Sequence, residues 1–216
     1  MKRIYCITLL TSLLLSACDE KHPDAKNVAE ELNNRKIRHI TEGEIMSSAE
    51  VKGIKTVLYC QKAISVKLEG AVEKEGMQKA MQYCVLRNYS FLDSLEKTDH
   101  MQIRRTSDKL RNPLNKSDSL EDTLFNAYQY NFTNGVSTNS HPPVMEEKYL
   151  LYTAPIIIEG TCLECHGVVG KDISEENYKI IKAAYPNDKA INYKLEQLRG
   201  MWSIKIDKKE LIKGMK

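Results

Sequence analysis

Apolar residues recur at helical spacing through the first half of the chain. Between Ser47 and Glu69 they fall three or four positions apart, which predicts an amphipathic helix. The stretch Met77–Leu95 has the same spacing and predicts a second helix, with Cys84 near the middle of its apolar face. A third helix is expected through Leu120–Tyr128, begun by Ser117 or Ser119 as the capping residue. Weaker helical spacing begins at Val28.

Alternation of apolar and polar residues becomes common in the second half. It predicts strands at Met101–Thr106, Met145–Ile158 and Met201–Ile206, of which the last is the clearest. The rigid run His141-Pro142-Pro143 predicts a loop, and a further helix is expected after Asp172 or Ser174 as its cap. Because helices come first and strands later, the pattern predicts an α+β fold with an antiparallel sheet and helices packed on it.

The N-terminus carries the features of an export signal. Lys2 and Arg3 precede an apolar run, Ile4–Leu15, which is shorter than the roughly 20 residues of a membrane-spanning helix. The run closes on Leu15-Ser16-Ala17-Cys18, which resembles a bacterial lipoprotein signal and implies lipid attachment at Cys18. An ordinary secretory signal with a chance cysteine is the alternative. Asp19 favours retention at the inner membrane, so we expect a lipid-anchored protein on the periplasmic side of the cell envelope.

Charge is nearly balanced. The 216 residues include 32 basic and 29 acidic side chains, and two of the basic ones lie in the signal. Nothing in this balance favours nucleic acid as a partner. Neither a nucleophile-elbow serine nor a phosphate-binding loop is present, so we do not expect an enzyme.

The candidate chemistry lies in Thr161-Cys162-Leu163-Glu164-Cys165-His166-Gly167. Two cysteines separated by two residues and followed by histidine form the attachment pattern of a c-type haem, in which His166 is the proximal iron ligand. A zinc site would need a second pair of ligands, and the chain has no second Cys-x-x-Cys. A thioredoxin-type disulfide would need a βαβ context, which is not predicted here.

Several longer stretches resemble the family of mono-haem c-type proteins with a PAS-like fold that is catalogued as a domain of unknown function. They are Arg105–Asn115 with Asp118 and Glu121, Tyr152–Ile158 running into the cysteine motif, and Tyr185–Ala190 with Tyr193, Arg199-Gly200 and Ser203. The resemblance implies a PAS-like antiparallel sheet flanked by helices, after a helical N-terminal extension. We therefore expect a signal at 1–17, a tether and first helical residues at 18–45, and the haem domain at 46–216. Asn192 and Glu196 stand where glycines are common in the family.

The resemblance also implies that Cys84 is the second axial ligand of one covalent haem c. From the residues alone, a buried core cysteine or a disulfide with Cys60 remains open for Cys84, and Cys60 itself is expected in the core. Other side chains could take the same place on the iron: Met77, Met81, Met101, Met145, Met201, His100 and His141.

The remaining predicted contacts concern the haem edge and walls. Arginine matches the two oxygens of a propionate, and the resemblance favours Arg111 and Arg199 over Arg104 and Arg105. Tyr185 and Trp202 are candidates for the pocket walls. The function expected is a sensor of redox state or of a small gas such as nitric oxide, acting through a separate signalling partner. An electron-transfer cytochrome with a redox partner is the alternative, and a haem enzyme such as a peroxidase is a third possibility.

Overall fold

The computed structural model describes residues 26–28, 40–136 and 139–216. The chain divides into two units, 1–39 and 40–216, and the fold described below is that of the second unit. The predicted signal, the lipid-attachment residue Cys18 and most of the weak helix after Val28 lie outside the described residues. Within the described part, no helix is both long enough and apolar enough to cross a bilayer.

The longest element is helix α2, Glu42–Leu68. The side chain of Thr41 accepts a hydrogen bond from the Glu44 amide, and the Glu44 carboxylate accepts one from the Thr41 amide, so the two residues form a capping box. The helix predicted from Ser47 is therefore confirmed, with a start five residues earlier. Its buried face includes Gly53 and Cys60, and Gly53 lies so close to the sheet that a Cβ there would overlap the ring of Tyr152.

The single helix predicted over Met77–Leu95 is wrong. After a short helix α3 (Ala71–Glu75), the chain forms α4 (Met77–Tyr83), a 3₁₀ turn η1 (Leu86–Asn88) and α5 (Ser90–Thr98). The break occurs because Val85 is extended, with φ −88° and ψ 103°. Side chains after the break bind the carbonyls that a continuing helix would have used: Asn88 Nδ2 donates to Gln82 O at 2.9 Å, and Tyr89 OH donates to Tyr83 O at 2.8 Å.

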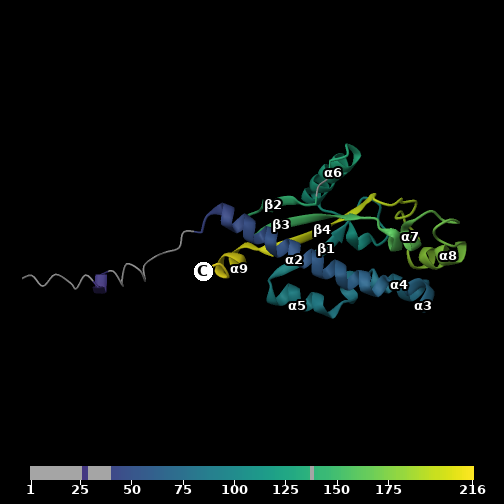
Figure 1. Cartoon of the computed structure of the whole chain (residues 1–216), viewed down its shortest axis with the longest axis horizontal. Coiled ribbons are helices and arrows are strands. Elements are labelled where there is room, and N and C mark those ends of the chain that lie inside the picture. Colours follow the sequence, from purple (N-terminus) through teal and green to yellow (C-terminus); the bar gives the residue numbers. More distant parts are fainter. Residues whose placement is uncertain (1–25, 29–39, 137–138) are drawn as a thin grey trace, which may run out of the picture. The chain divides into compact units, whose positions relative to one another are not determined.

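Four antiparallel strands form one sheet, in the order β1-β4-β3-β2 (Figure 1). The strands are β1 (Met101–Thr106), β2 (His141–Met145), β3 (Tyr149–Ile157) and β4 (Leu198–Asp207). The predicted α+β architecture of an antiparallel sheet with flanking helices is confirmed. The strand predicted over Met145–Ile158 is divided, because Met145 ends β2 and only β3 continues.

The loop predicted for His141-Pro142-Pro143 is wrong, because these residues begin the edge strand β2. Proline lacks the amide that a central strand must donate, but an edge strand tolerates it. The register between β2 and β3 shifts between His141 and Val144, at the two prolines.

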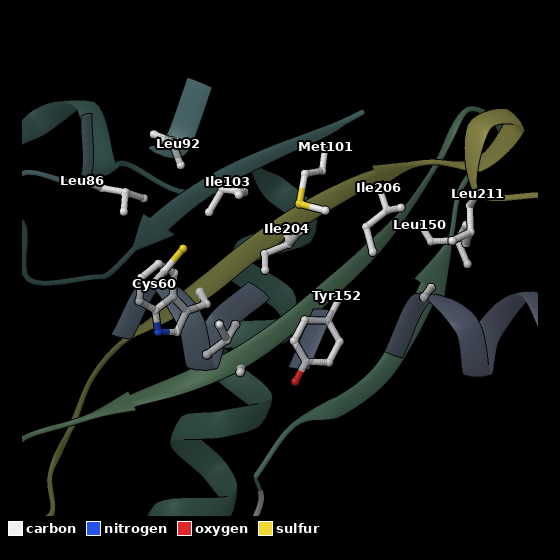
Figure 2. Close-up of a cluster of buried hydrophobic side chains, with 14 of the residues drawn as sticks. Cys60, Leu86, Leu92, Met101, Ile103, Leu150, Tyr152, Ile204, Ile206 and Leu211 are labelled. Atoms are coloured by element: carbon white, nitrogen blue, oxygen red, sulfur yellow. The ribbon is translucent and has the colours of Figure 1, made fainter. Parts of the chain in front are cut away.

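One face of the sheet packs on α2 and forms the main core. Tyr152 and Ile204 point to this face, and Cys60 is fully buried against it, which confirms Cys60 as a core residue (Figure 2). Trp202 belongs to the same buried cluster. Burial raises the pKa of the Cys60 thiol to about 11. Cys60 and Cys84 are both free thiols.

The other face of the sheet carries α6, Ser119–Thr133 (Figure 1). The cap is Asp118 rather than Ser117 or Ser119, because Asp118 and Glu121 form a capping box. Glu121 is buried and also accepts a hydrogen bond from Ser203 Oγ on β4 at 2.6 Å. The helix is thus attached to the sheet by its first turn.

Short helices gather at the end of the sheet where β3 leaves and β4 enters. Helix α7 (Gly160–His166) was not predicted, whereas α8 (Glu175–Ala184) begins at Ser174 as predicted. The remaining elements are the 3₁₀ turn η2 (Pro113–Asn115) and the C-terminal helix α9 (Lys208–Lys213). Asn192 and Glu196 have φ of 63° and 65°, the left-handed region that favours glycine.

Candidate functional site

A cavity of about 470 Å³ opens between α2, the end of α4, strand β1, helix α7 and the start of β4. This volume lies in the range of about 300–1,000 Å³ that is usual for cofactor pockets. The apolar part of its wall includes Ile64, Met81, Ile103, Ile158 and Trp202. Five arginines also line it: Arg87, Arg104, Arg105, Arg111 and Arg199.

Helix α7 presents the cysteine motif to this cavity. Cys162, Cys165 and His166 all line the cavity, and the two cysteines are free thiols. Burial raises the pKa of Cys162 and raises that of Cys165 to about 12. A redox-active dithiol would have a thiol with a lowered pKa, so the disulfide alternative is disfavoured.

The chain turns sharply after the motif, at Gly167. A Cβ at Gly167 would lie 2.5 Å from the Asp172 Cβ and 2.7 Å from the Leu163 carbonyl oxygen, so a side chain does not fit. The Asp172 carboxylate accepts a hydrogen bond from the Val168 amide at 2.8 Å and fixes the turn. The glycine therefore allows this tight turn directly after His166.

His166 is held in one tautomer by a backbone carbonyl group. Its Nδ1 lies 2.7 Å from the Ala190 carbonyl oxygen, which can only accept, so Nδ1 carries the proton and Nε2 keeps its lone pair. Burial lowers the pKa of His166 well below its usual value, and the charges of Arg199 and Arg111 act in the same direction. The ring is therefore neutral, the form that binds iron.

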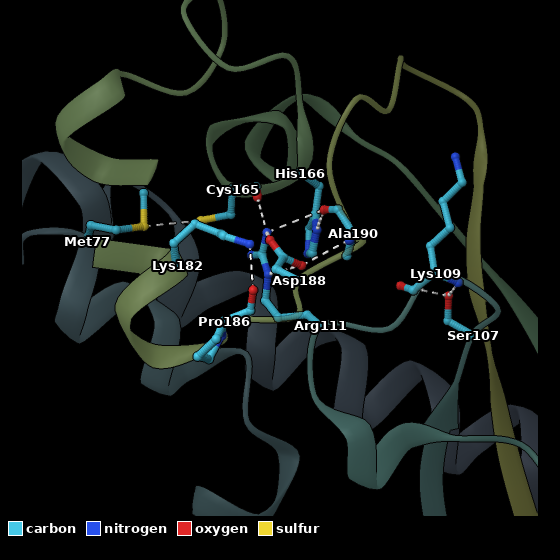
Figure 3. A network of polar contacts seen from close by, with 10 residues as sticks. All are labelled: Met77, Ser107, Lys109, Arg111, Cys165, His166, Lys182, Pro186, Asp188 and Ala190. Carbon is cyan, nitrogen blue, oxygen red and sulfur yellow. Dashed lines mark hydrogen bonds and ion pairs between the residues drawn. The ribbon is translucent and has the colours of Figure 1, made fainter. Parts of the chain in front are cut away.

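Arg111 connects the parts of the chain around His166 (Figure 3). Its guanidinium donates to both carboxylate oxygens of Asp188, at 3.2 and 3.0 Å, and to the Cys165 carbonyl at 2.6 Å. It also reaches the Ala190 carbonyl at 3.3 Å, while Asp188 accepts from the Ala190 amide at 2.9 Å. Arg111 thus lines the cavity, but each of these described contacts is to a protein group. Its predicted contact with a haem propionate stays a prediction.

Cys84 lies at the C-terminal cap of α4, is half-buried, and lines the same cavity as helix α7. Of the rival ligands, Met81 also lines the cavity and Met77 contacts the Cys165 sulfur at 3.6 Å. The others are not among the residues that line it: Met101, Met145, Met201, His100 and His141. The break in the helix, which the sequence did not predict, follows directly after Cys84, at Val85.

The hydrogen bonds of Arg199 indicate what kind of group the cavity could hold. Its Nη1 donates to Ser107 Oγ at 2.7 Å, but its buried Nε has no hydrogen-bond partner among the described residues. The buried hydroxyl of Thr106, also on the cavity wall, likewise lacks a partner within this part of the chain. Burial lowers the pKa of Arg199, and the charges of Arg111 and Arg105 add to this effect.

An anion in the cavity would offset this crowding of positive charge. In the described part of the chain, neither Arg105 nor Arg199 forms an ion pair with a carboxylate. An apolar wall beside unpaired guanidinium groups and two thiols suits a flat apolar ring with carboxylate side chains. The residues present therefore fit the haem that the sequence predicts. No three His, Cys, Asp or Glu side chains of the described chain gather closely enough to hold a metal ion, so the zinc alternative lacks a ligand set there.

Tyr185 and Trp202 both line the cavity. Tyr185 caps the C-terminus of α8 and Trp202 lies on β4, and their predicted contact with a haem stays a prediction. The roles of Asp188 and of the Ala190 carbonyl were missed. Both lie within the Tyr185–Ala190 stretch that carries the family resemblance, which was the available signal.

Comparisons with known proteins agree with this fold. A family model described as Tll0287-like matches residues 20–207 of the chain. A solved structure of the cyanobacterial haem protein Tll0287 is similar in fold, with a TM-score of 0.54 and 19% sequence identity. The similarity covers 72% of this chain and 95% of that one. No curated protein sequence matches this chain.

Proposed function

This chain belongs to the Tll0287-like family, and we propose from this premise that it is a mono-haem c-type cytochrome whose haem occupies the cavity. The observation that carries the proposal is the position of Cys162, Cys165 and His166 on one wall of the cavity, with His166 Nδ1 bound to the Ala190 carbonyl. The two thiols would attach the ring and His166 Nε2 would bind its iron. The solved relative is itself described as a haem protein, which supports the choice of cofactor.

The second axial ligand in this proposal is Cys84. It lines the same cavity as His166 but comes from a different element, so the two side chains would hold one iron from two parts of the chain. Thiolate donates charge and stabilises ferric iron, so this ligand would hold the reduction potential low. Met81, one turn earlier on α4, also lines the cavity and is the alternative second ligand.

Electron uptake and binding of a small ligand are the chemistry that a haem supplies when bound. The chain's own residues favour a sensor of redox state or of a gas such as nitric oxide. Cys84 stands at a break between α4 and η1, where side-chain hydrogen bonds rather than a continuous helix hold the backbone. A ligand on such a segment could leave the iron and move the segment with it. A separate signalling protein would then respond to this movement.

Export and anchoring are part of the same proposal, because haem attachment to thiols takes place outside the cytoplasm. The charged start, the apolar run and Cys18 support a lipid-modified protein on the periplasmic side of the inner membrane. Growth with labelled palmitate tests this. Wild-type protein should carry the label and Cys18→Ala should not; a label retained by Cys18→Ala contradicts lipid attachment at that residue.

Absorption spectra test the ligation and the sensing role together. We compare haem-loaded wild type with Cys84→Ser and Met81→Leu, in ferric and ferrous states, with and without carbon monoxide. The proposal predicts that Cys84→Ser changes the ferric spectrum, that Met81→Leu does not, and that the ferrous wild type binds carbon monoxide. A ferrous form that stays six-coordinate and excludes the gas indicates an electron carrier instead. Turnover of peroxide would indicate an enzyme.

A further inference from the structure

The segment that carries Cys84 is held at three successive carbonyl groups. Asn88 donates to the Gln82 carbonyl and Tyr89 to the Tyr83 carbonyl, both from within the same segment. The third is the carbonyl of Cys84 itself, which accepts from the guanidinium of Arg105, 21 residues further along the chain. Among these three contacts, only that of Arg105 ties the segment to the sheet.

Arg105 is fixed on the sheet by its own surroundings. It lies on β1 directly opposite Trp202 on β4, and its guanidinium carbon lies 5.4 Å from the centre of the Trp202 ring. Trp202 is buried, whereas Arg105 is half-buried. A guanidinium over an indole ring is attracted to it, which restricts the arginine to one position. No carboxylate of the described chain competes for this guanidinium in an ion pair.

The hydrogen bond from Arg105 is a charge-assisted one to a neutral carbonyl. Such bonds are stronger than those between two neutral groups. Four backbone amides of the same segment each donate to the carbonyl three residues earlier: those of Cys84, Val85, Asn88 and Tyr89. These local bonds do not by themselves place the segment against the cavity.

We infer that Arg105 is a positioning residue for the sixth ligand: it binds the Cys84 carbonyl and thereby sets how readily Cys84 leaves the iron. The inference rests on the proposed ligation by Cys84. Loss of the guanidinium would remove the direct hydrogen bond between Cys84 and the sheet and leave the segment held by the packing of Leu86 and by its local bonds, so the segment would open more often. Movement of Cys84 would in turn shift Arg105 on β1 and its contact with Trp202, so the sheet is directly connected to the ligand.

The test compares haem-loaded full-length wild type with Arg105→Gln, Arg105→Lys and the control Lys97→Gln. Lys97 is an exposed cation on the neighbouring helix α5, outside the cavity wall and outside the peptide that is measured. Hydrogen exchange of the peptide 84–89 in the ferric protein reports opening of the segment. We expect Arg105→Gln to exchange about tenfold faster there, Arg105→Lys to fall between it and wild type, and Lys97→Gln to match wild type. The association rate of carbon monoxide with the ferrous protein should rise in the same order.

Three outcomes distinguish the role of Arg105 from the ligation by Cys84. Exchange and gas association in Arg105→Gln that stay within twofold of wild type overturn the inference. Faster exchange without a change in gas association also overturns it, because Arg105 would then support the backbone without controlling the ligand. A ferric spectrum that Cys84→Ser leaves unchanged removes the proposed ligation itself, which is a separate failure. Should Arg105→Gln not fold, the Arg105→Lys variant carries the same comparison.

Discussion

Replacing Arg111 by methionine should disturb both the stability of the fold and the orientation of His166. The Asp188 side chain is fully buried, so Arg111→Met leaves its carboxylate without a cation, and it also removes the donor to the Cys165 carbonyl. Removal of one partner from a buried ion pair costs about 3–5 kcal/mol. We expect this loss in the free energy of unfolding, measured by urea denaturation of the haem-loaded protein at neutral pH.

The double variant Arg111→Met/Asp188→Asn separates a stranded charge from lost packing. If the stranded charge dominates, the double variant should be more stable than Arg111→Met alone, although one interaction has been removed from each side. Arg87→Met is the control: its ion pair with Glu96 is exposed on the arginine side, at 60% of the side-chain surface, and should cost about 1 kcal/mol or less. A cost below about 1 kcal/mol for Arg111→Met, or additive costs in the double variant, would refute the reasoning.

Three further predictions concern other parts of the fold. Gly53→Ala should destabilise the protein by about 1–2 kcal/mol, because the new Cβ meets the Tyr152 ring. Gly43→Ala on the same helix has open space and should stabilise it by up to about 1 kcal/mol. Changes of the same sign in the free energy of unfolding, measured by urea denaturation, would contradict this packing. Glu196→Gly should stabilise by up to about 1 kcal/mol, because Glu196 has a φ of 65°, and a loss of stability would show that this conformation is not strained. Burial opposes ionisation of Asp118, but hydrogen bonds from the Glu121 amide and from Lys205 lower its pKa overall. The ionised carboxylate therefore contributes to the stability of the fold above about pH 4, and this contribution is lost as the pH falls below that value. Asp118→Asn should therefore reduce the loss of stability between pH 5 and pH 2 measured by thermal unfolding, and an unchanged pH profile would count against it.

The sequence predicted those elements whose patterns are decided locally. The long helix, three of the strands and the α8 cap follow from spacing and capping residues, because α2 and β4 each have one clearly apolar face. The break at Cys84 could not be predicted in this way. The stretch around it contains neither glycine nor proline, and its carbonyls are bound by Asn88, Tyr89 and the distant Arg105.

The site was predictable where a motif specifies chemistry, and less so where the fold supplies partners. Cys162, Cys165 and His166 followed from their spacing, and the structure brings all three to one cavity. The network of Arg111 could not be foreseen, because Asp188 lies 77 residues away and is brought close only by the folded chain. The edge strand at His141-Pro142-Pro143 was missed for a similar reason: proline excludes central strands but not edges.

Covalent attachment of one haem to Cys162 and Cys165 is the central claim, and the intact mass of the purified protein tests it most directly. The full chain is produced in a bacterium that matures c-type cytochromes, next to Cys162→Ala/Cys165→Ala. We predict that the denatured wild type retains the mass of one iron porphyrin, together with a pyridine haemochrome spectrum of the c type, and that the double variant does not. Wild-type protein with the mass of the bare polypeptide would contradict the account.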